Sequence, residues 1–123
     1  MTIIGTGVDL VEVPRFEQAV SRGGDRFLAR VFTPAERAYA RSRKTMMQHL
    51  AARFAAKEAV VKALGAPKGL GLEWQDLEIT RGKNGEPGVR FHRSMARWKG
   101  LKVHLSLTHT HQYAVATALI FKQ

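Results

Sequence analysis

The segment from Thr45 to Leu64 constrains the fold most, because it predicts one long helix. It is rich in alanine, leucine, methionine, lysine and glutamate and contains neither glycine nor proline, which is the composition of strong helix formers. Gly65 and Pro67 follow it, a typical signal for the end of a helix. A chain of 123 residues has room for one modest core around such a helix, so we predict a single domain over residues 1–123.

The segments before the long helix predict one strand and two shorter helices. Thr2–Val11 is rich in β-branched residues and predicts a strand. Pro14 begins a predicted helix that ends at Gly23-Gly24. Thr33-Pro34-Ala35-Glu36 has the spacing of a capping box, which predicts a short helix to about Ser42.

The segments after the long helix predict strands joined by tight turns. Lys83-Asn84-Gly85-Glu86 contains Asn-Gly, a strong hairpin signal, and a short helix is predicted over Arg93–Lys99. Strands outside one central helix favour an α+β fold, with an antiparallel sheet packed around that helix, over alternating β-α-β units. The predicted strands are Trp74–Arg81, Val89–His92, Lys102–His109 and Tyr113–Phe121.

The charge balance favours anionic partners. Twenty Lys and Arg residues against ten Asp and Glu residues give a formal net charge of +10. Such a surface attracts nucleic acid, anionic lipid, phosphorylated small molecules or an acidic protein, or it is simply solvated. The lack of cysteine excludes disulfides and thiolate chemistry. The sequence shows no signal-peptide pattern and no run near the ~20 apolar residues that span a bilayer, so we expect a soluble, cytoplasmic protein.

Glu58 lies within a predicted apolar stripe of the long helix. Leu50, Phe54 and Val61 share this stripe at spacings of four and seven residues. A carboxylate facing a core is unfavourable unless a cation pairs with it. Lys62, one turn further on, is one such cation. An internal Glu58–Lys62 ion pair is therefore one explanation, and a functional site is the other.

Three basic residues recur every four positions on the neighbouring face of the helix. They are His49, Arg53 and Lys57. Stacked cations repel each other, which a solvated face tolerates and a phosphate-binding face exploits, because the anion offsets the repulsion. Arg43 and Lys44 lie just before the helix and extend this basic patch.

Asp9 is the second acidic residue of interest. The alternate positions before it, Gly5 and Gly7, leave room for a close neighbour. An aspartate at a strand end also begins turns. Together, Asp9 and Glu58 would suit magnesium, which takes one or two carboxylates, several waters and phosphate oxygens. Sequence spacing does not show whether the fold joins them.

Several motifs occur in a specific order along nearly the whole chain. The first two are Gly7-Val8-Asp9-Leu10 and Phe54-Ala55-Ala56-Lys57-Glu58-Ala59-Val60-Val61-Lys62. They resemble the signature motifs of the 4′-phosphopantetheinyl transferase superfamily, and the fit is closest to its short bacterial type, the holo-acyl-carrier-protein synthases. Asn84-Gly85-Glu86-Pro87 and Leu105–Thr110, followed by Tyr113-Ala114, resemble further motifs of that type.

The resemblance implies a donor, a metal and a reaction. Acids matching Asp9 and Glu58 hold Mg²⁺ in this family, and the lysine matching Lys62 contacts the phosphates of coenzyme A. Glu58 and Lys62 are therefore the expected catalytic residues, for transfer of the phosphopantetheine arm to a serine of apo acyl carrier protein in fatty acid biosynthesis. Larger relatives carry a further acid where this chain has Val11, so we expect two protein carboxylates on the metal. The expected coenzyme A-binding residues are Lys44, His49, Arg53, Lys57, Asn84, Gly85, Pro87 and His109.

The resemblance also implies partners. An acidic acyl carrier protein would dock on the early helix through Arg15, Arg22 and Arg26, with Phe16 and Phe27 as apolar neighbours; the alternative is that both phenylalanines belong to the core. Short members form homotrimers with active sites between subunits. Two other functions remain open: a basic nucleic-acid-binding module, which leaves Asp9 and Glu58 unexplained, and a binder of coenzyme A or a carrier protein that does not catalyse transfer.

Overall fold

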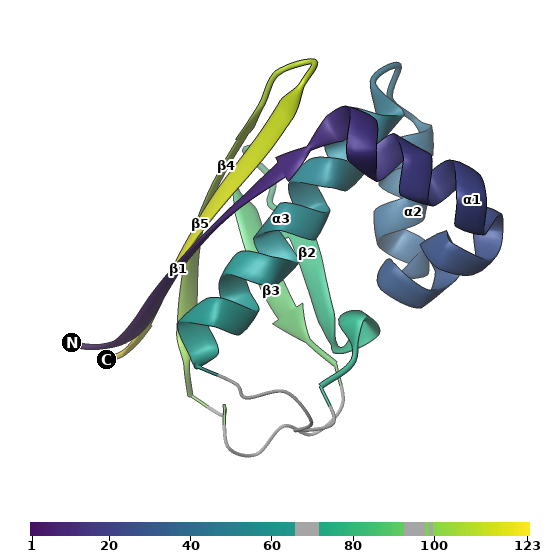
Figure 1. Cartoon of the computed structure of the whole chain (residues 1–123). Helices are drawn as coiled ribbons and strands as arrows, with labels where there is room; N and C mark the ends of the chain where they lie inside the picture. The colour runs from purple at the N-terminus through teal and green to yellow at the C-terminus, as the bar shows by residue number, and fades with distance from the viewer. Residues whose placement is uncertain (66–71, 93–97, 99) are drawn as a thin grey trace.

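A three-stranded antiparallel sheet and one long helix form the centre of the protein (Figure 1). The structure is a computed structural model that describes residues 1–65, 72–92, 98 and 100–123. Strands β1 (Thr2–Glu12), β5 (Tyr113–Lys122) and β4 (Lys102–His109) lie side by side in that order. Helix α3 (Met46–Leu64) packs across one face of this sheet. These elements confirm the predicted α+β architecture.

Helix α3 touches β1 backbone to backbone. A Cβ atom on Gly5 would lie 2.0 Å from the carbonyl oxygen of Ala63, and one on Gly7 would lie 2.0 Å from the carbonyl oxygen of Ala59. Any side chain at either position would therefore push the strand off the helix. The two glycines set the separation of β1 and α3, as their pattern in the sequence indicates.

The buried face of α3 differs from the predicted apolar stripe. Phe54 and Val61 are only half-buried, and Glu58 lies between them on the more open side of the helix. Small side chains instead face the sheet, because the close backbone approach leaves no room for larger ones. The main core cluster contains Ala55, Ala56, Ala59, Val60, Ala63, Leu77, Ile79, Leu105, Ala116, Ala118 and Ile120.

Two further helices pack beside the first half of α3 (Figure 1). Helix α1 (Val13–Val31) was predicted to end at its glycine pair; it instead continues past a kink at Gly24, whose φ of 59° and ψ of −148° are not helical. Helix α2 (Pro34–Arg41) begins with the predicted capping box of Thr33 and Glu36.

A hairpin completes the described part of the chain. Strands β2 (Leu77–Arg81) and β3 (Pro87–Phe91) pair antiparallel, and Gly85 at the turn has a φ of 84°. The predicted strand from Trp74 begins instead with a short 3₁₀ turn, η1 (Trp74–Asp76). The helix predicted over residues 93–99 falls largely outside the described residues.

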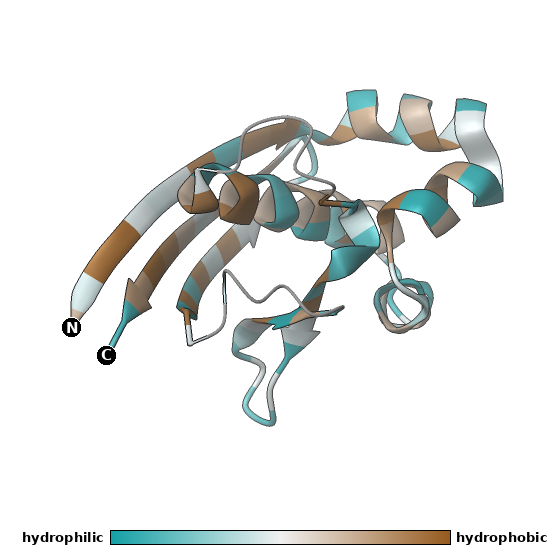
Figure 2. Ribbon diagram, turned by 90° about the horizontal axis from the view of Figure 1, so that it is seen from below, coloured by the Kyte–Doolittle hydropathy of each residue, from teal (hydrophilic) through white to brown (hydrophobic). Residues whose placement is uncertain are grey.

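Hydrophobic and hydrophilic bands alternate along β1 (Figure 2). Among the described helices, none is long and apolar enough to cross a membrane.

Candidate active site

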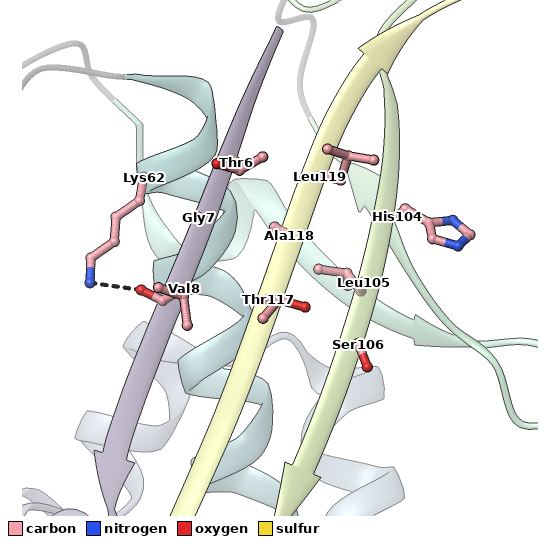
Figure 3. A pocket seen from close by; sticks show the side chains of 10 residues that line it. All are labelled: Thr6, Gly7, Val8, Lys62, His104, Leu105, Ser106, Thr117, Ala118 and Leu119. Atoms are coloured by element: carbon pink, nitrogen blue, oxygen red, sulfur yellow. Dashed lines mark hydrogen bonds between the residues drawn. The ribbon is translucent and has the colours of Figure 1, made fainter. Parts of the chain in front are cut away.

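Three functional side chains predicted from the sequence meet where β1 runs along α3. Asp9 comes from β1, whereas Glu58 and Lys62 come from successive turns of α3, and all three line one hollow. The Nζ atom of Lys62 donates hydrogen bonds to Asp9 Oδ1 and to the carbonyl oxygen of Val8, each at 3.0 Å (Figure 3 shows the bond to Val8). The fold thus joins residues that lie about fifty positions apart.

The charges around Glu58 make it a more basic carboxylate than usual. Burial raises the pKa of Glu58, the negative charge of Asp9 raises it further, and Lys62 opposes both effects. Within the described residues, the ion pair of Lys62 is with Asp9 and not with Glu58. The Glu58–Lys62 pair considered from the sequence is therefore not what keeps Glu58 on this face.

Asp9 and Glu58 suit a small divalent cation. They offer hard oxygen donors, and a cationic group, the Lys62 ammonium, already contacts Asp9. Across the described ranges, no three or more His, Asp or Glu side chains gather around a common point. A metal here would take its other ligands from water and substrate phosphate. Val11, where we expected no third acid, also lines the hollow.

A second hollow lies beside the amino-terminal half of α3 and the β2–β3 turn. It brings together five residues expected to bind coenzyme A, namely His49, Arg53, Gly85, Pro87 and His109. The rings of His49 and His109 lie 5.2 Å apart. Burial lowers the pKa of His49, and the positive charges of His109 and the nearby arginines lower it further. The hollow is therefore a basic, partly aromatic site suited to an anion.

Two residues of this second hollow were missed from the sequence. They are Tyr39, on α2, and Arg81, at the end of β2. Arg81 donates a hydrogen bond to the Tyr39 hydroxyl. Neither residue belongs to a recognised motif, and only the packing of α2 against α3 and β2 brings them there. The position of Arg81 shortly before the Asn-Gly turn is the one signal that could have indicated this edge.

The structure corrects the prediction that Lys57 contributes to a phosphate-binding face. Lys57 is fully buried, and its Nζ atom lies 2.7 Å from Glu36 Oε1. It also donates to the carbonyl oxygens of Val31 at 2.7 Å and Trp74 at 3.0 Å. Burial lowers the pKa of Lys57, and Glu36 opposes that shift. All three ammonium protons are used inside the protein, so Lys57 has none to offer a cofactor.

Lys44 and Asn84 do not line the second hollow. Both are exposed, Lys44 between α2 and α3 and Asn84 in the hairpin turn, where its backbone N–H donates to Glu86 Oε2 at 3.0 Å. Their assignment to coenzyme A therefore remains an expectation of the resemblance.

The three arginines predicted to dock a carrier protein are exposed on α1. Arg15 lines the hollow that holds Asp9 and Glu58, whereas Arg22 and Arg26 lie further along the helix. Phe16 is a core residue: it is 5% exposed and packs against the rings of Phe27, Phe32 and Phe54.

Comparisons with known proteins identify the family of this chain. A family model described as the 4′-phosphopantetheinyl transferase superfamily matches residues 5–118. The holo-[acyl-carrier-protein] synthase of Koribacter versatilis is 47% identical over 122 residues, covering 96% of this chain and 98% of the relative. That of Moorella thermoacetica is 50% identical over 123 residues, covering 96% and 94%.

Solved structures show the same fold. The holo-(acyl-carrier-protein) synthase of Bacillus anthracis, in complex with CoA (3′,5′-ADP), has a TM-score of 0.83 at 31% identity and covers 100% of both chains. The synthase of Neisseria meningitidis has a TM-score of 0.88 at 27% identity, covering 98% of this chain and 99% of the other. With its acidic pair, its basic hollow and these matches along nearly its whole length, the chain belongs to the 4′-phosphopantetheinyl transferase superfamily.

Proposed function

We propose that this protein transfers the 4′-phosphopantetheine arm of coenzyme A to a serine of apo acyl carrier protein and releases adenosine 3′,5′-bisphosphate. The observation that carries the proposal is the placement of two different sites on one helix. Asp9, Glu58 and Lys62 line one hollow, and Arg53 lines the basic hollow. Arg53 precedes Glu58 by about a turn and a half of α3, which is roughly 8 Å along the helix axis. A pyrophosphate and the nucleotide attached to it require such a pair of sites.

The basic hollow is the proposed nucleotide site. Arg53 and Arg81 supply fixed positive charge, and His49 and His109 supply ring nitrogens. Gly85 and Pro87 present the hairpin turn to the same space, which suits a flat adenine base. Lys44 and Asn84 are exposed, and an incoming nucleotide would contact them outside the hollow.

We assign Asp9 and Glu58 as the residues that would hold a magnesium ion. When bound, the ion would supply positive charge to the anionic pyrophosphate. Lys62 would hold a phosphate oxygen and neutralise the negative charge that grows as the bond to the leaving group breaks. Its flexible, half-exposed side chain can exchange Asp9 for a phosphate oxygen.

The chemical step is attack by the serine hydroxyl on the phosphorus that bears the pantetheine arm. A new phosphorus–oxygen bond to serine forms, the bond to the second phosphate breaks, and adenosine 3′,5′-bisphosphate leaves with that electron pair. The serine proton goes to Glu58, directly or through a water molecule. In the metal-free protein, burial and the charge of Asp9 raise the pKa of Glu58, which favours its role as a proton acceptor.

We propose that an acidic carrier protein docks on α1. Arg15 borders both this exposed surface and the hollow with Asp9 and Glu58, so a carrier held there would present its serine to the reacting phosphorus. Arg22 and Arg26 would add longer-range attraction, which salt should weaken. Arg15→Glu should raise the KM for carrier protein and leave the binding of coenzyme A unchanged. Equal loss of both would contradict this assignment.

We further propose a homotrimer with active sites between subunits. No described element covers the face of the sheet turned away from α3, which carries Thr6, Val8, Thr117, Leu119, His104 and Ser106 (Figure 3). Val8 and Leu10 are 57% and 60% exposed. Apolar residues gathered on an open sheet face indicate a surface that another protein covers, and a second copy of this chain suits it. We also propose that the enzyme serves fatty acid biosynthesis and works in the cytoplasm.

One assay tests the reaction. The protein is mixed with coenzyme A, Mg²⁺ and an apo acyl carrier protein at low salt, and the carrier is weighed by mass spectrometry. A gain equal to the arm supports transfer; no gain with any carrier, although coenzyme A binds, would identify a non-catalytic binder. Glu58→Gln keeps the shape and removes the charge, so transfer should fall by at least ~100-fold while the fold survives. Binding to nucleic acid alone would favour the other alternative, which none of the relatives described above supports.

A further inference from the structure

Tyr39 lies at the centre of a cluster of arginines. The guanidinium carbons of Arg53, Arg43 and Arg81 lie 4.4, 4.9 and 5.3 Å from the centroid of its ring. Arg81 also donates a hydrogen bond to the tyrosine hydroxyl. The arginines come from three separate segments: α3, the loop after α2, and the end of β2. One aromatic side chain on α2 therefore contacts cations from three segments of the chain.

Nearby carboxylates act on Arg53, because the negative charges of Glu36 and Glu78 favour its charged form. Among the ion pairs of the described residues, none includes these three arginines. Arg53 is buried and donates to the carbonyl oxygen of Ile79, which fixes its position but does not neutralise it. The negative face of an aromatic ring attracts a cation within about 6 Å, and more strongly where water is excluded. The Tyr39 ring contacts all three guanidinium groups, and its negative face offsets part of the repulsion between them.

We infer that Tyr39 is a positioning residue of the nucleotide site. Its ring gathers the arginines before any ligand arrives, so that an entering phosphate meets hydrogen-bond donors that are already in place. Two of them, Arg53 and Arg81, line the hollow with Tyr39 itself, and Arg43 contacts the ring from an exposed position. Preorganisation of this kind raises affinity because less conformational freedom is lost on binding. The inference rests on the proposed function only for the identity of the nucleotide.

The part of α3 that Tyr39 contacts predicts which kinetic constant this residue controls. Its ring contacts His49 at 5.6 Å between centroids and Arg53, whereas Glu58 and Lys62 lie in the other hollow. Loss of the ring should therefore weaken binding of the nucleotide and leave the chemical step intact. A residue needed only for folding would instead lower the amount of active enzyme and reduce kcat.

The first experiment compares Tyr39→Met, which keeps an apolar side chain without a ring, with Tyr39→Phe, which keeps the ring. Calorimetry with adenosine 3′,5′-bisphosphate measures binding without requiring transfer. Tyr39→Met should bind at least ~10-fold more weakly, with adenosine 5′-monophosphate less affected, and Tyr39→Phe should lose at most ~3-fold. With coenzyme A, Tyr39→Met should raise KM and change kcat by less than ~2-fold. Wild-type affinity in Tyr39→Met, or a fall in kcat at unchanged KM, would overturn the inference.

The second experiment uses an exposed arginine, which avoids misfolding. Arg43→Gln should weaken adenosine 3′,5′-bisphosphate binding by ~5-fold in the wild type and by less than ~2-fold in Tyr39→Met, because without the ring Arg43 is no longer held in place. Independent effects, or no effect of Arg43→Gln in the wild type, would overturn the inference. If the nucleotide binds in this way but no carrier protein gains mass, the proposed transfer fails while the role of Tyr39 stands.

Discussion

Replacing Lys57 with methionine should be among the most destabilising single changes that this chain can suffer. The substitution keeps the linear apolar stem, so it leaves little empty space. It removes the ammonium that pairs with Glu36 at 2.7 Å and that donates to two carbonyl oxygens. Glu36, which is 1% exposed, is left as a buried anion. Breaking one partner of a buried ion pair costs about 3–5 kcal/mol, a large share of the ~5–15 kcal/mol that typically stabilises a domain.

Urea unfolding at a fixed protein concentration measures this loss. For a slope near ~2 kcal/mol per molar urea, the midpoint should fall by about 2 M. Lys83→Met removes an exposed lysine in the hairpin turn and should change stability by less than ~0.5 kcal/mol. A loss below ~1 kcal/mol for Lys57→Met would refute the reasoning, because it would mean that water reaches the Glu36 carboxylate.

A double-mutant cycle separates the ion pair from its surroundings. In the wild type, the Glu36 carboxylate accepts a hydrogen bond from the backbone N–H of Thr33 at 2.9 Å. Glu36→Gln removes the charge, but the oxygen of the new amide can still accept this bond. It cannot also accept well from the backbone N–H of Ile79, which now lies 2.7 Å from the second oxygen. The double variant should be less destabilised than the sum of the single variants. Additive losses would show that the two charges do not interact.

Three further predictions concern the site and its surroundings. Gly7→Ala brings a Cβ to 2.0 Å from the Ala59 carbonyl oxygen, so calorimetric melting should show a loss of about 1–3 kcal/mol and transfer activity should fall, whereas Thr6→Ala on the open face should change little. A bound phosphate should raise the pKa of His49, which burial and then nearby cations lower in the free protein. Coenzyme A should therefore bind most tightly below the pKa of His49 in the free protein, and more weakly as pH rises through its pKa in the complex. Calorimetry should detect proton uptake on binding over about pH 5–8; binding without proton uptake would contradict this. Leu10→Asp places a charge on the uncovered sheet face, so sedimentation should show a smaller particle than the wild type; an unchanged mass would contradict the homotrimer.

The sequence predicted the elements of the fold well where local chemistry decides them. The capping box of α2, the left-handed glycine after α3 and the Asn-Gly turn each act over a few residues, and each occurs as predicted. The kink at Gly24 differs, because the second half of α1 is held by the packing of Leu28 and Val31 in the core. A glycine pair shows where a helix can bend but not whether the chain resumes it.

The faces of α3 were predicted less well, for a physical reason. Periodicity assumes that the largest apolar side chains face the core. Here the core face carries alanines, because β1 approaches the helix backbone, and the long side chains lie to the side. The same assumption placed Lys57 with His49 and Arg53, since nothing local indicates that Glu36 on another helix neutralises it. Glu58 was expected in a core stripe, whereas it lies on the open side of α3 and lines a hollow with Asp9 and Lys62.

The direct contact between β1 and α3 also isolates Asp9 and Glu58 from changes elsewhere in the core. Where side chains separate two elements, exchanging a leucine for a valine moves them and everything they carry. Between Gly7 and Ala59 no side chain intervenes, so the span from the Asp9 backbone to that of Glu58 is set by hard atomic radii. Core residues such as Leu77, Ile79 and Ile120 can therefore be substituted while the distance between the two carboxylates stays the same.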